Sequence, residues 1–373
     1  MKTEVITTLP MDPKRAQELF LFTTPFAAHL IAKATGRELY LPINRVGEAD
    51  SVQATPYEKG LVNLGIRPYT LSYDDDPLFL EWMKGFINEK YASGELNIRE
   101  KDLVKCPCGA VEMLAEATEK IEKRTNGKTF NISSSGNMGC RKCGQEVFSS
   151  QEPVLLTNQT ELKNNVITKP NRYAPIVEQH LQEFVVRPQL VSRGRDTALQ
   201  VYLEGKPFSI DNDYIWLHYG RYLQDDLPIK GIIASNHSVR KGALYAHFAA
   251  EQAPDIYLFV TPYVSFRWPS IRFGMDTLSD SYSPDILRAF LLTHLNWQIQ
   301  NSYADPNLLR WCSRVTRDLP VSDATTIDSL ANITNIFRGH SLKRLAQDMS
   351  KGTDLTEDQE LLISTLQTGT HHS

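Results

Sequence analysis

The first hundred residues alternate short apolar runs with a longer stretch of helical spacing. Residues 4–9, 38–43 and 69–73 are rich in β-branched and aromatic side chains, which is typical of strands. Residues 16–34 carry apolar side chains at the spacing of a buried helix, and Gly36 follows as an end signal. This order of strand, helix and strand forms a βαβ unit and predicts a parallel sheet.

The same pattern returns after a polar and irregular interval that follows Cys143. Residues 231–235 and 256–260 are apolar runs typical of buried strands, and residues 239–250 between them have helical spacing. From residue 283 onward the pattern is almost entirely helical. Between these parts the pattern predicts a helix at 176–184 and further strands at 185–188, 199–203 and 214–217.

These elements predict an α/β fold in which a Rossmann-like parallel sheet is split by a zinc-knuckle insertion. A short helical region completes the chain. We expect four parts, which are the first half of the sheet domain, the insertion, the second half and the helical region, at residues 1–100, 101–184, 185–295 and 296–373.

Two close cysteine pairs lie in the predicted insertion. Their sequences are Cys106-Pro107-Cys108-Gly109 and Cys140-Arg141-Lys142-Cys143-Gly144. Two thiolates from each of two tight turns supply the four ligands of a structural zinc ion, and each glycine allows backbone N–H groups to point at sulfur. Such a site leaves no position open for a reacting water. Redox-active dithiols and two disulfides are the alternatives that the spacing leaves open.

Composition and net charge limit which binding partners and which cellular compartment we expect for this chain. The chain of 373 residues has a formal net charge of -4, which argues against coating by nucleic acid but allows a local basic patch. No apolar run is long enough to span a bilayer, and no secretory signal is visible, so we expect a reducing, cytoplasmic compartment. A reducing compartment favours metal over disulfides at the four cysteines.

The candidate catalytic and binding residues lie near the ends of predicted strands. His237 follows the apolar strand at 231–235 and precedes a helix, and such positions face the ligand crevice of parallel sheets. The alternative for His237 is that it caps this helix together with Ser238. Arg240 and Lys241 follow one turn later, where they bind an anion or are simply solvated. Trp216, Tyr219 and Tyr222 line an aromatic pocket or belong to the core. The run Asp74-Asp75-Asp76 before Pro77 is more typical of a helix cap than of a magnesium site.

Six spaced segments, covering roughly residues 1–300, resemble a class I aminoacyl-tRNA synthetase, most closely its methionyl branch. The glutamyl and glutaminyl branch is the nearest competitor. The paired cysteines are one of these segments. The others are Thr7-Thr8-Leu9-Pro10, Leu64-Gly65-Ile66 with Leu71-Ser72-Tyr73-Asp74, Ser192-Arg193, the stretch from Tyr214 to Tyr222, and Ser283 to Leu292.

The resemblance implies a site whose parts are altered in this chain. Family members use a HIGH motif and a KMSKS motif with ATP, but the matching windows read Lys14-Arg15-Ala16-Gln17-Glu18 and Arg267-Trp268-Pro269-Ser270-Ile271-Arg272. The only histidine near the first window is His29, which is more typical of a core position. The acid that receives the substrate's amino group would fall near Asn44-Arg45, and the usual aspartate after the Trp216 stretch is His218. Arg45 either meets a carboxylate or phosphate or pairs with a surface acid.

By the resemblance, Pro10 and Met11 line a substrate pocket, Arg267 and Arg272 are candidate anion ligands, and Arg45 and His218 are catalytic candidates. His237 as a catalytic candidate and Arg240 as an anion ligand follow instead from their place after the strand at 231–235. The expected partners are a small amino acid or derivative and the acceptor end of a tRNA, for which Lys120, Lys123, Arg124 and Lys128 offer a basic flank. Loss of both motifs gives no support for ATP as a cofactor. Three functions remain open: transfer of a pre-activated acyl group or amide formation, a non-catalytic binding or regulatory module, and ATP-dependent activation of an amino acid.

Overall fold

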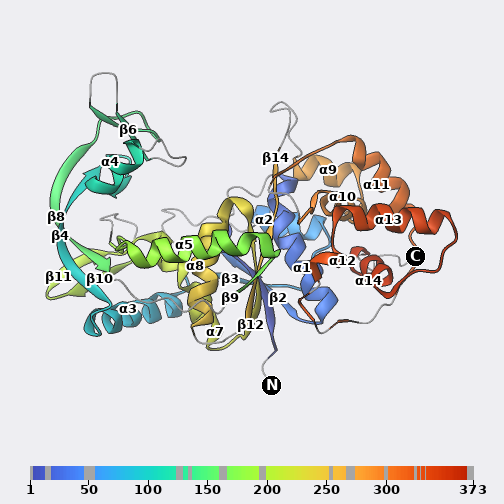
Figure 1. Cartoon of the computed structure of the whole chain (residues 1–373), viewed down its shortest axis with the longest axis horizontal. Helices are drawn as coiled ribbons and strands as arrows, with labels where there is room; N and C mark the ends of the chain where they lie inside the picture. Colours follow the sequence, from blue (N-terminus) through green and yellow to red (C-terminus); the bar gives the residue numbers. More distant parts are fainter. Residues whose placement is uncertain are drawn as a thin grey trace.

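A central parallel sheet lies between an extended two-stranded arm and a cluster of helices in the computed structural model (Figure 1). The structure describes residues 3–12, 18–45, 55–122, 129–132, 137–158, 166–192, 199–251, 255–265, 274–297, 301–322, 326–327, 329–331 and 333–367. The first motif window, residues 14–18, lies almost wholly outside these residues, and the second, residues 267–272, lies entirely outside them.

The sheet has six parallel strands. Their spatial order is β3 (Thr70–Tyr73), β2 (Glu38–Ile43), β1 (Val5–Thr8), β12 (Ile229–Ser235), β13 (Ile256–Thr261) and β9 (Val166–Lys169). Ile6 of β1 lies opposite Leu39 on one side and Gly231 on the other, which fixes the register at the centre of the sheet. The predicted α/β class with a Rossmann-like parallel sheet is confirmed.

Helices cover both faces of this sheet, as a parallel sheet requires. Successive side chains alternate between two apolar clusters, so that Ile6 packs on one face and Val5 on the other. The first face is covered by α1 (Thr23–Thr35), α2 (Thr55–Asn63) and α10 (Pro284–His294). The second face is covered by α3 (Pro77–Ala92), α5 (Ala174–Val186) and α8 (Val239–Ala250).

Helix α8 approaches the sheet closely where β12 ends. A Cβ atom at Gly242 would lie 2.8 Å from the Cβ of Ala234, so glycine is needed for this contact. The close contact fixes the first turn of α8 beside the carboxyl end of β12. The residues that connect β12 to α8, Asn236 to Ser238, form the short 3-10 helix η4.

The insertion is an antiparallel arm that carries a small module at its tip (Figure 1). β4 (Leu96–Lys105) and β8 (Phe148–Thr157) pair along their whole length, and β5 (Val111–Met113) extends this ladder. The tip contains α4 (Leu114–Glu122), β6 (Phe130–Ile132) and β7 (Met138–Cys140). The expectation of irregular chain after Cys143 is therefore wrong, because β8 pairs with β4 over ten residues.

Two further elements differ from the sequence prediction. The strand that returns to the sheet is β9, whereas Val185 and Val186 end α5. Residues 214–217, predicted as a strand, belong to α6 (Asn212–Leu217), which begins because the Asp211 carboxylate accepts the Asp213 N–H at 2.9 Å. The division of the chain into four parts stays a prediction.

The remaining elements complete the edges of the fold. These are the 3-10 helices η2 (Leu19–Phe22) and η3 (Asn171–Tyr173), the hairpin β10 (Gln200–Leu203) with β11 (Lys206–Ser209), α7 (Tyr219–Gln224), the parallel pair β14 (Tyr263–Ser265) with β15 (Asn301–Tyr303), and α9 (Met275–Ser281), α11 (Asn307–Arg317), α12 (Ile333–Ile336), α13 (Gly339–Ser350) and α14 (Glu357–Leu366). Among the described residues, no helix has the length and apolar character needed to cross a membrane.

Candidate functional site

A cavity of about 450 Å³ opens at the carboxyl edge of the sheet. It lies between β1 and β12, where the strand order turns in opposite directions, and parallel sheets bind their ligands at such a point. Its lining combines chain from both halves of the sheet, namely Thr8 to Asp12, Phe20, Leu21, Thr23, Thr24, Asn44, Asp213, Trp216, Ile233 to Ser235, His237, Ser238, Lys241 and Pro262 to Val264.

His237 lies at the edge of this cavity on η4, as the sequence position predicted. Its side chain is exposed, and its ring centre is 5.5 Å from that of Tyr263. The hydroxyl oxygens of Ser235 and Ser238 are 3.3 Å apart on either side of this residue in the sequence. An imidazole with access to both cavity and solvent can accept and release a proton.

Trp216 forms a wall of the cavity together with Asp213 and Lys241. The Trp216 indole donates a hydrogen bond to Asp213 Oδ1 at 2.9 Å, and the Lys241 ammonium donates to the same oxygen at 2.9 Å. Lys241 Nζ is also 5.2 Å from the centre of the indole, within range of a cation–π contact. These contacts hold a positive charge beside an aromatic surface in the cavity.

Pro10 and Met11, which follow β1, are among the residues that line the cavity, and their role in substrate binding stays a prediction. Met11 N–H donates to Pro42 O at 3.0 Å, and Asn44 N–H donates to Met11 O at 2.8 Å, so the exit of β1 is tied to the end of β2. These bonds bring Asn44 into the lining.

His218 lies in a different place from His237. It lines a separate cavity of about 50 Å³ near the root of the arm, and its ring is stacked on Phe248 at 4.1 Å between ring centres. Burial lowers the pKa of His218 well below its usual value, and neither ring nitrogen has a hydrogen-bond partner among the described residues. The structure does not bring these two predicted catalytic histidines together.

The two predicted pocket tyrosines pack in the apolar cluster beside Phe79 and do not line the cavity. Tyr219 is buried, with its ring edge-on to Phe79 at 4.8 Å between ring centres. Burial also raises the pKa of the Tyr219 hydroxyl. Tyr222 is half-buried, and its ring is 5.1 Å from that of Phe79. Among the aromatic residues from Tyr214 to Tyr222, Trp216 is the one that lines the cavity.

Arg45 is directed toward acids at the end of β3. Its Nε is 3.3 Å from an Asp75 carboxylate oxygen, its guanidinium lies 4.9 Å from the Tyr73 ring centre, and its backbone N–H donates to Asp74 at 2.6 Å. Asp76 caps α3 by accepting the Leu78 N–H, as the sequence predicted. Arg45 is thus held outside the residues that line the cavity.

The other predicted arginines do not add to the described lining. Arg240 is exposed on α8 and is not among the lining residues, although the adjacent Lys241 is. Arg267 and Arg272 lie outside the described residues, as do Lys123, Arg124 and Lys128. His29 is a buried core residue, with Nε2 3.2 Å from a guanidinium nitrogen of Arg288.

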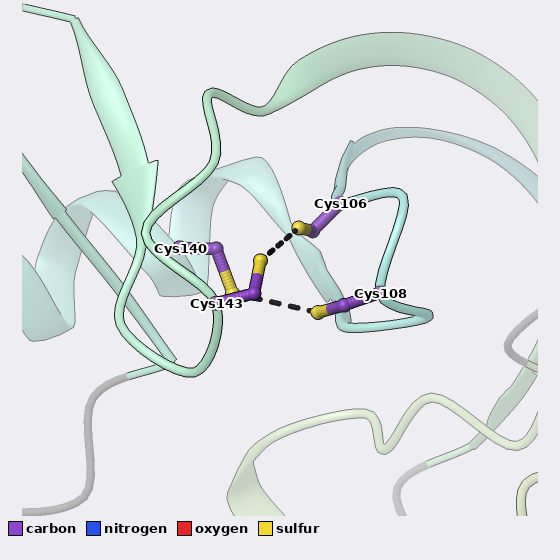
Figure 2. A group of neighbouring side chains, drawn as sticks. All are labelled: Cys106, Cys108, Cys140 and Cys143. Carbon is purple, nitrogen blue, oxygen red and sulfur yellow. Dashed lines mark hydrogen bonds between the residues drawn. The ribbon is translucent and has the colours of Figure 1, made fainter.

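The four paired cysteines converge at the tip of the arm, as Figure 2 shows. Their four sulfur atoms lie within 4.8 Å of one another, with Cys106 and Cys143 3.3 Å apart and Cys108 and Cys140 3.6 Å apart. Thiolates bound about 2.3 Å from a tetrahedral zinc ion are about 3.8 Å apart, so this arrangement fits the ion.

Two similar turns build this cluster. Cys106 N–H donates to Ala110 O at 2.9 Å, and Cys140 N–H donates to Gln145 O at 2.8 Å. Gly109 and Gly144 have φ angles of 84° and 74°, which favour glycine. A hydrogen bond from the Ala110 backbone lowers the pKa of Cys108 to about 7, so the turn already favours the thiolate that a metal needs. The cluster could hold a metal, and its donor set is that of structural zinc.

The sequence did not lead us to Asp213 as a site residue, and it left Lys241 as either an anion ligand or a solvated side chain. The signal was available, because Asp213 and Trp216 are three residues apart and share one face if the stretch is helical. Their side chains would have been placed on opposite faces of the predicted strand, so the wrong element hid the contact.

No protein-family model and no curated protein matches this sequence. Solved structures of Mycobacterium tuberculosis methionyl-tRNA synthetase are similar in fold. The enzyme in complex with methionyl-adenylate has a TM-score of 0.61 at 13% identity, covering 99% of this chain and 89% of that one. A second structure bound by methionyl-adenylate gives 0.61 at 13% identity, with 98% and 89% covered. The apo form gives 0.57 at 13% identity, with 99% and 86% covered. The chain therefore has the fold of a class I synthetase core.

Proposed function

We propose that this chain takes an amino-acid-derived acyl group from an already activated donor, such as an aminoacyl-tRNA, and transfers it to an acceptor. The observation that carries the proposal is the cavity of about 450 Å³ at the β1–β12 switch point, with the imidazole of His237 at its edge. Its size falls in the range of small-molecule sites, which is about 300–1,000 Å³. An arm that carries a metal-binding module extends from the same sheet and offers a second contact for a large donor.

The reaction needs no ATP because the ester of the donor is already activated. An amine or hydroxyl of the acceptor attacks the acyl carbonyl, and His237 accepts the proton that the acceptor loses. The ester C–O bond breaks, and the departing ribose oxygen takes up a proton from the resulting imidazolium. The proposal assigns this proton transfer to His237 alone, since His218 lines a separate cavity.

The first experiment asks whether the purified protein catalyses amino-acid-dependent exchange of pyrophosphate into ATP. We expect no exchange. Exchange would support ATP-dependent activation of an amino acid and overturn the proposal. In the second experiment the protein is incubated with a pool of charged tRNA, with and without candidate amines, and loss or transfer of the acyl group is followed. Binding without loss or transfer would favour the non-catalytic module.

A variant then tests the residue. His237→Ala should reduce transfer about 100-fold or more, the usual effect of losing a general base. His180→Ala is the matched control, because His180 lies on α5, contacts Glu183 at 3.5 Å and lines none of the cavities described above. Equal transfer by the two variants would remove His237 from the mechanism.

A further inference from the structure

The described lining of the cavity contains one ammonium, that of Lys241, beside the carboxylates of Asp12 and Asp213. Lys241 is the only lysine or arginine among the described residues that line it. Its ammonium is held over Trp216 by the cation–π contact and by the hydrogen bond to Asp213. An ammonium has three N–H donors, and Asp213 receives one of them, so the group can still donate to a ligand.

The position of this charge is supported by a chain of contacts. Asp211 is 3% exposed and caps α6, which places Asp213 in the first turn of that helix. Asp213 in turn accepts hydrogen bonds from Trp216 and Lys241. The indole is 4% exposed and is therefore a rigid surface. The buried indole therefore holds the ammonium of Lys241 at a defined place in the lining.

The ion pair itself is a weak reason to keep Lys241. The side chains of Lys241 and Asp213 are 49% and 50% exposed, and pairs as exposed as this contribute little to folding. Because folding hardly needs Lys241, its half-exposed ammonium at the edge of a substrate-sized cavity is better explained by the ligands that the cavity accepts. A thioether or aliphatic side chain would displace water from the ammonium without replacing its hydrogen bonds.

We infer that Lys241 selects an acyl group with an anionic side chain, such as a glutamyl or aspartyl group, in place of an apolar one. This inference rests on the proposed function, because it assumes that the acyl group occupies this cavity beside Trp216. The Lys241 ammonium can donate a charge-assisted hydrogen bond to a carboxylate or to a neutral amide oxygen, but only the carboxylate adds the attraction between two opposite charges.

Matched pairs of stable ligands provide the test. The probes are 3′-aminoacylamido-3′-deoxyadenosines that carry glutamyl, glutaminyl, aspartyl or asparaginyl groups, and binding is measured by calorimetry at pH 7.5. Within each pair only the charge of the side chain differs. We expect the acidic member to bind about 10-fold tighter, because only its carboxylate adds Coulomb attraction to the ammonium in this partly exposed site. Recognition of the nucleoside cannot produce this ratio, since both members share it.

Variants assign the ratio to Lys241. In Lys241→Ala the ratio should fall to about 1, and in Lys241→Glu it should invert. Lys84→Ala is the matched control, because Lys84 is an exposed lysine paired to Glu81 at 3.0 Å but lies on α3 away from the cavity. It should keep the wild-type ratio.

The outcomes separate the inference from the proposed function. Equal binding of all four compounds by the wild-type protein would overturn the selectivity and leave acyl transfer standing. A ratio that survives in Lys241→Ala would overturn the role of Lys241. If none of the four compounds binds, both the inference and the proposed acyl site are wrong.

Discussion

Arg288 joins the C-terminal helices to the sheet domain, and replacing it by methionine should destabilise the chain. This arginine is fully buried on α10. Its guanidinium donates to Gly65 O at 3.1 Å and to Leu64 O at 3.3 Å, just after the end of α2, and to Thr365 O in the last turn of α14. Thr365 lies in the last turn of α14, and Leu64 and Gly65 directly follow α2, so the guanidinium donates to carbonyls at the ends of two helices at once.

Two opposing effects set the size of the change. Leaving three buried carbonyls without a donor costs about 1–3 kcal/mol each, or about 6 kcal/mol together. Burial lowers the pKa of Arg288 to about 10, which corresponds to about 3 kcal/mol for desolvating the charge, and methionine avoids this cost. The net loss should be about 3 kcal/mol, since methionine keeps most of the apolar contacts of the side chain.

Urea unfolding followed by far-UV circular dichroism would measure this difference. The control is Arg317→Met, because Arg317 is 74% exposed and pairs with the adjacent Asp318. That variant should stay within about 0.5 kcal/mol of the wild type. If Arg288→Met unfolds at the same urea concentration as the control, or at a higher one, desolvation outweighs the hydrogen bonds and the reasoning is wrong.

Two further predictions concern the metal cluster and a buried histidine. Elemental analysis should find about one zinc per chain. Chelation should expose the tip of the arm to protease, whereas β4 and β8 should stay paired because their ten-residue ladder does not depend on Cys106 or Cys143. A metal-free protein whose tip is protected from protease would contradict this. His218→Phe should flatten the loss of stability at acid pH. Because burial lowers its pKa, His218 stays neutral in the folded protein, whereas in the unfolded chain it takes up a proton below about pH 6.5. Protonation of the unfolded chain lowers the unfolding free energy of the wild type by up to about 1.4 kcal/mol per pH unit, and His218→Phe should not show this loss. Parallel unfolding free energies of the two proteins from pH 7.5 to 5.0 would refute this.

The parallel sheet could be predicted because its strands carry their own signal. Strands buried on both faces are continuous apolar runs, and β2, β12 and β13 lie within one or two residues of the predicted ranges. The metal cluster could be predicted for a similar reason, since cysteine spacing and glycine in the turns are local requirements. Helix α8 also followed from local pattern, because residues 239–250 have helical spacing.

The arm could not be predicted because its stability comes from pairing between distant segments. Strands β4 and β8 carry many polar residues, since much of their surface is solvated, and their partners are about fifty residues apart in the chain. The strand predicted at 214–217 is wrong for the same reason, because contacts outside this segment decide its structure. Tyr214, Ile215 and Trp216 have β composition, but the cap at Asp211 and burial against the sheet domain decide for a helix.

The outer residues of the cavity lining are also the least constrained by the fold. His237 is exposed, and the Asp213–Lys241 pair is about half exposed, so substitutions at these positions cost little in folding free energy. The strand residues directly beneath them, Ile233 and Ala234, are buried and hold the edge in place. An unchanged sheet can therefore present a different charge pattern at the same switch point. The fold predicts where a substrate binds, whereas the side chains at the edge decide which one.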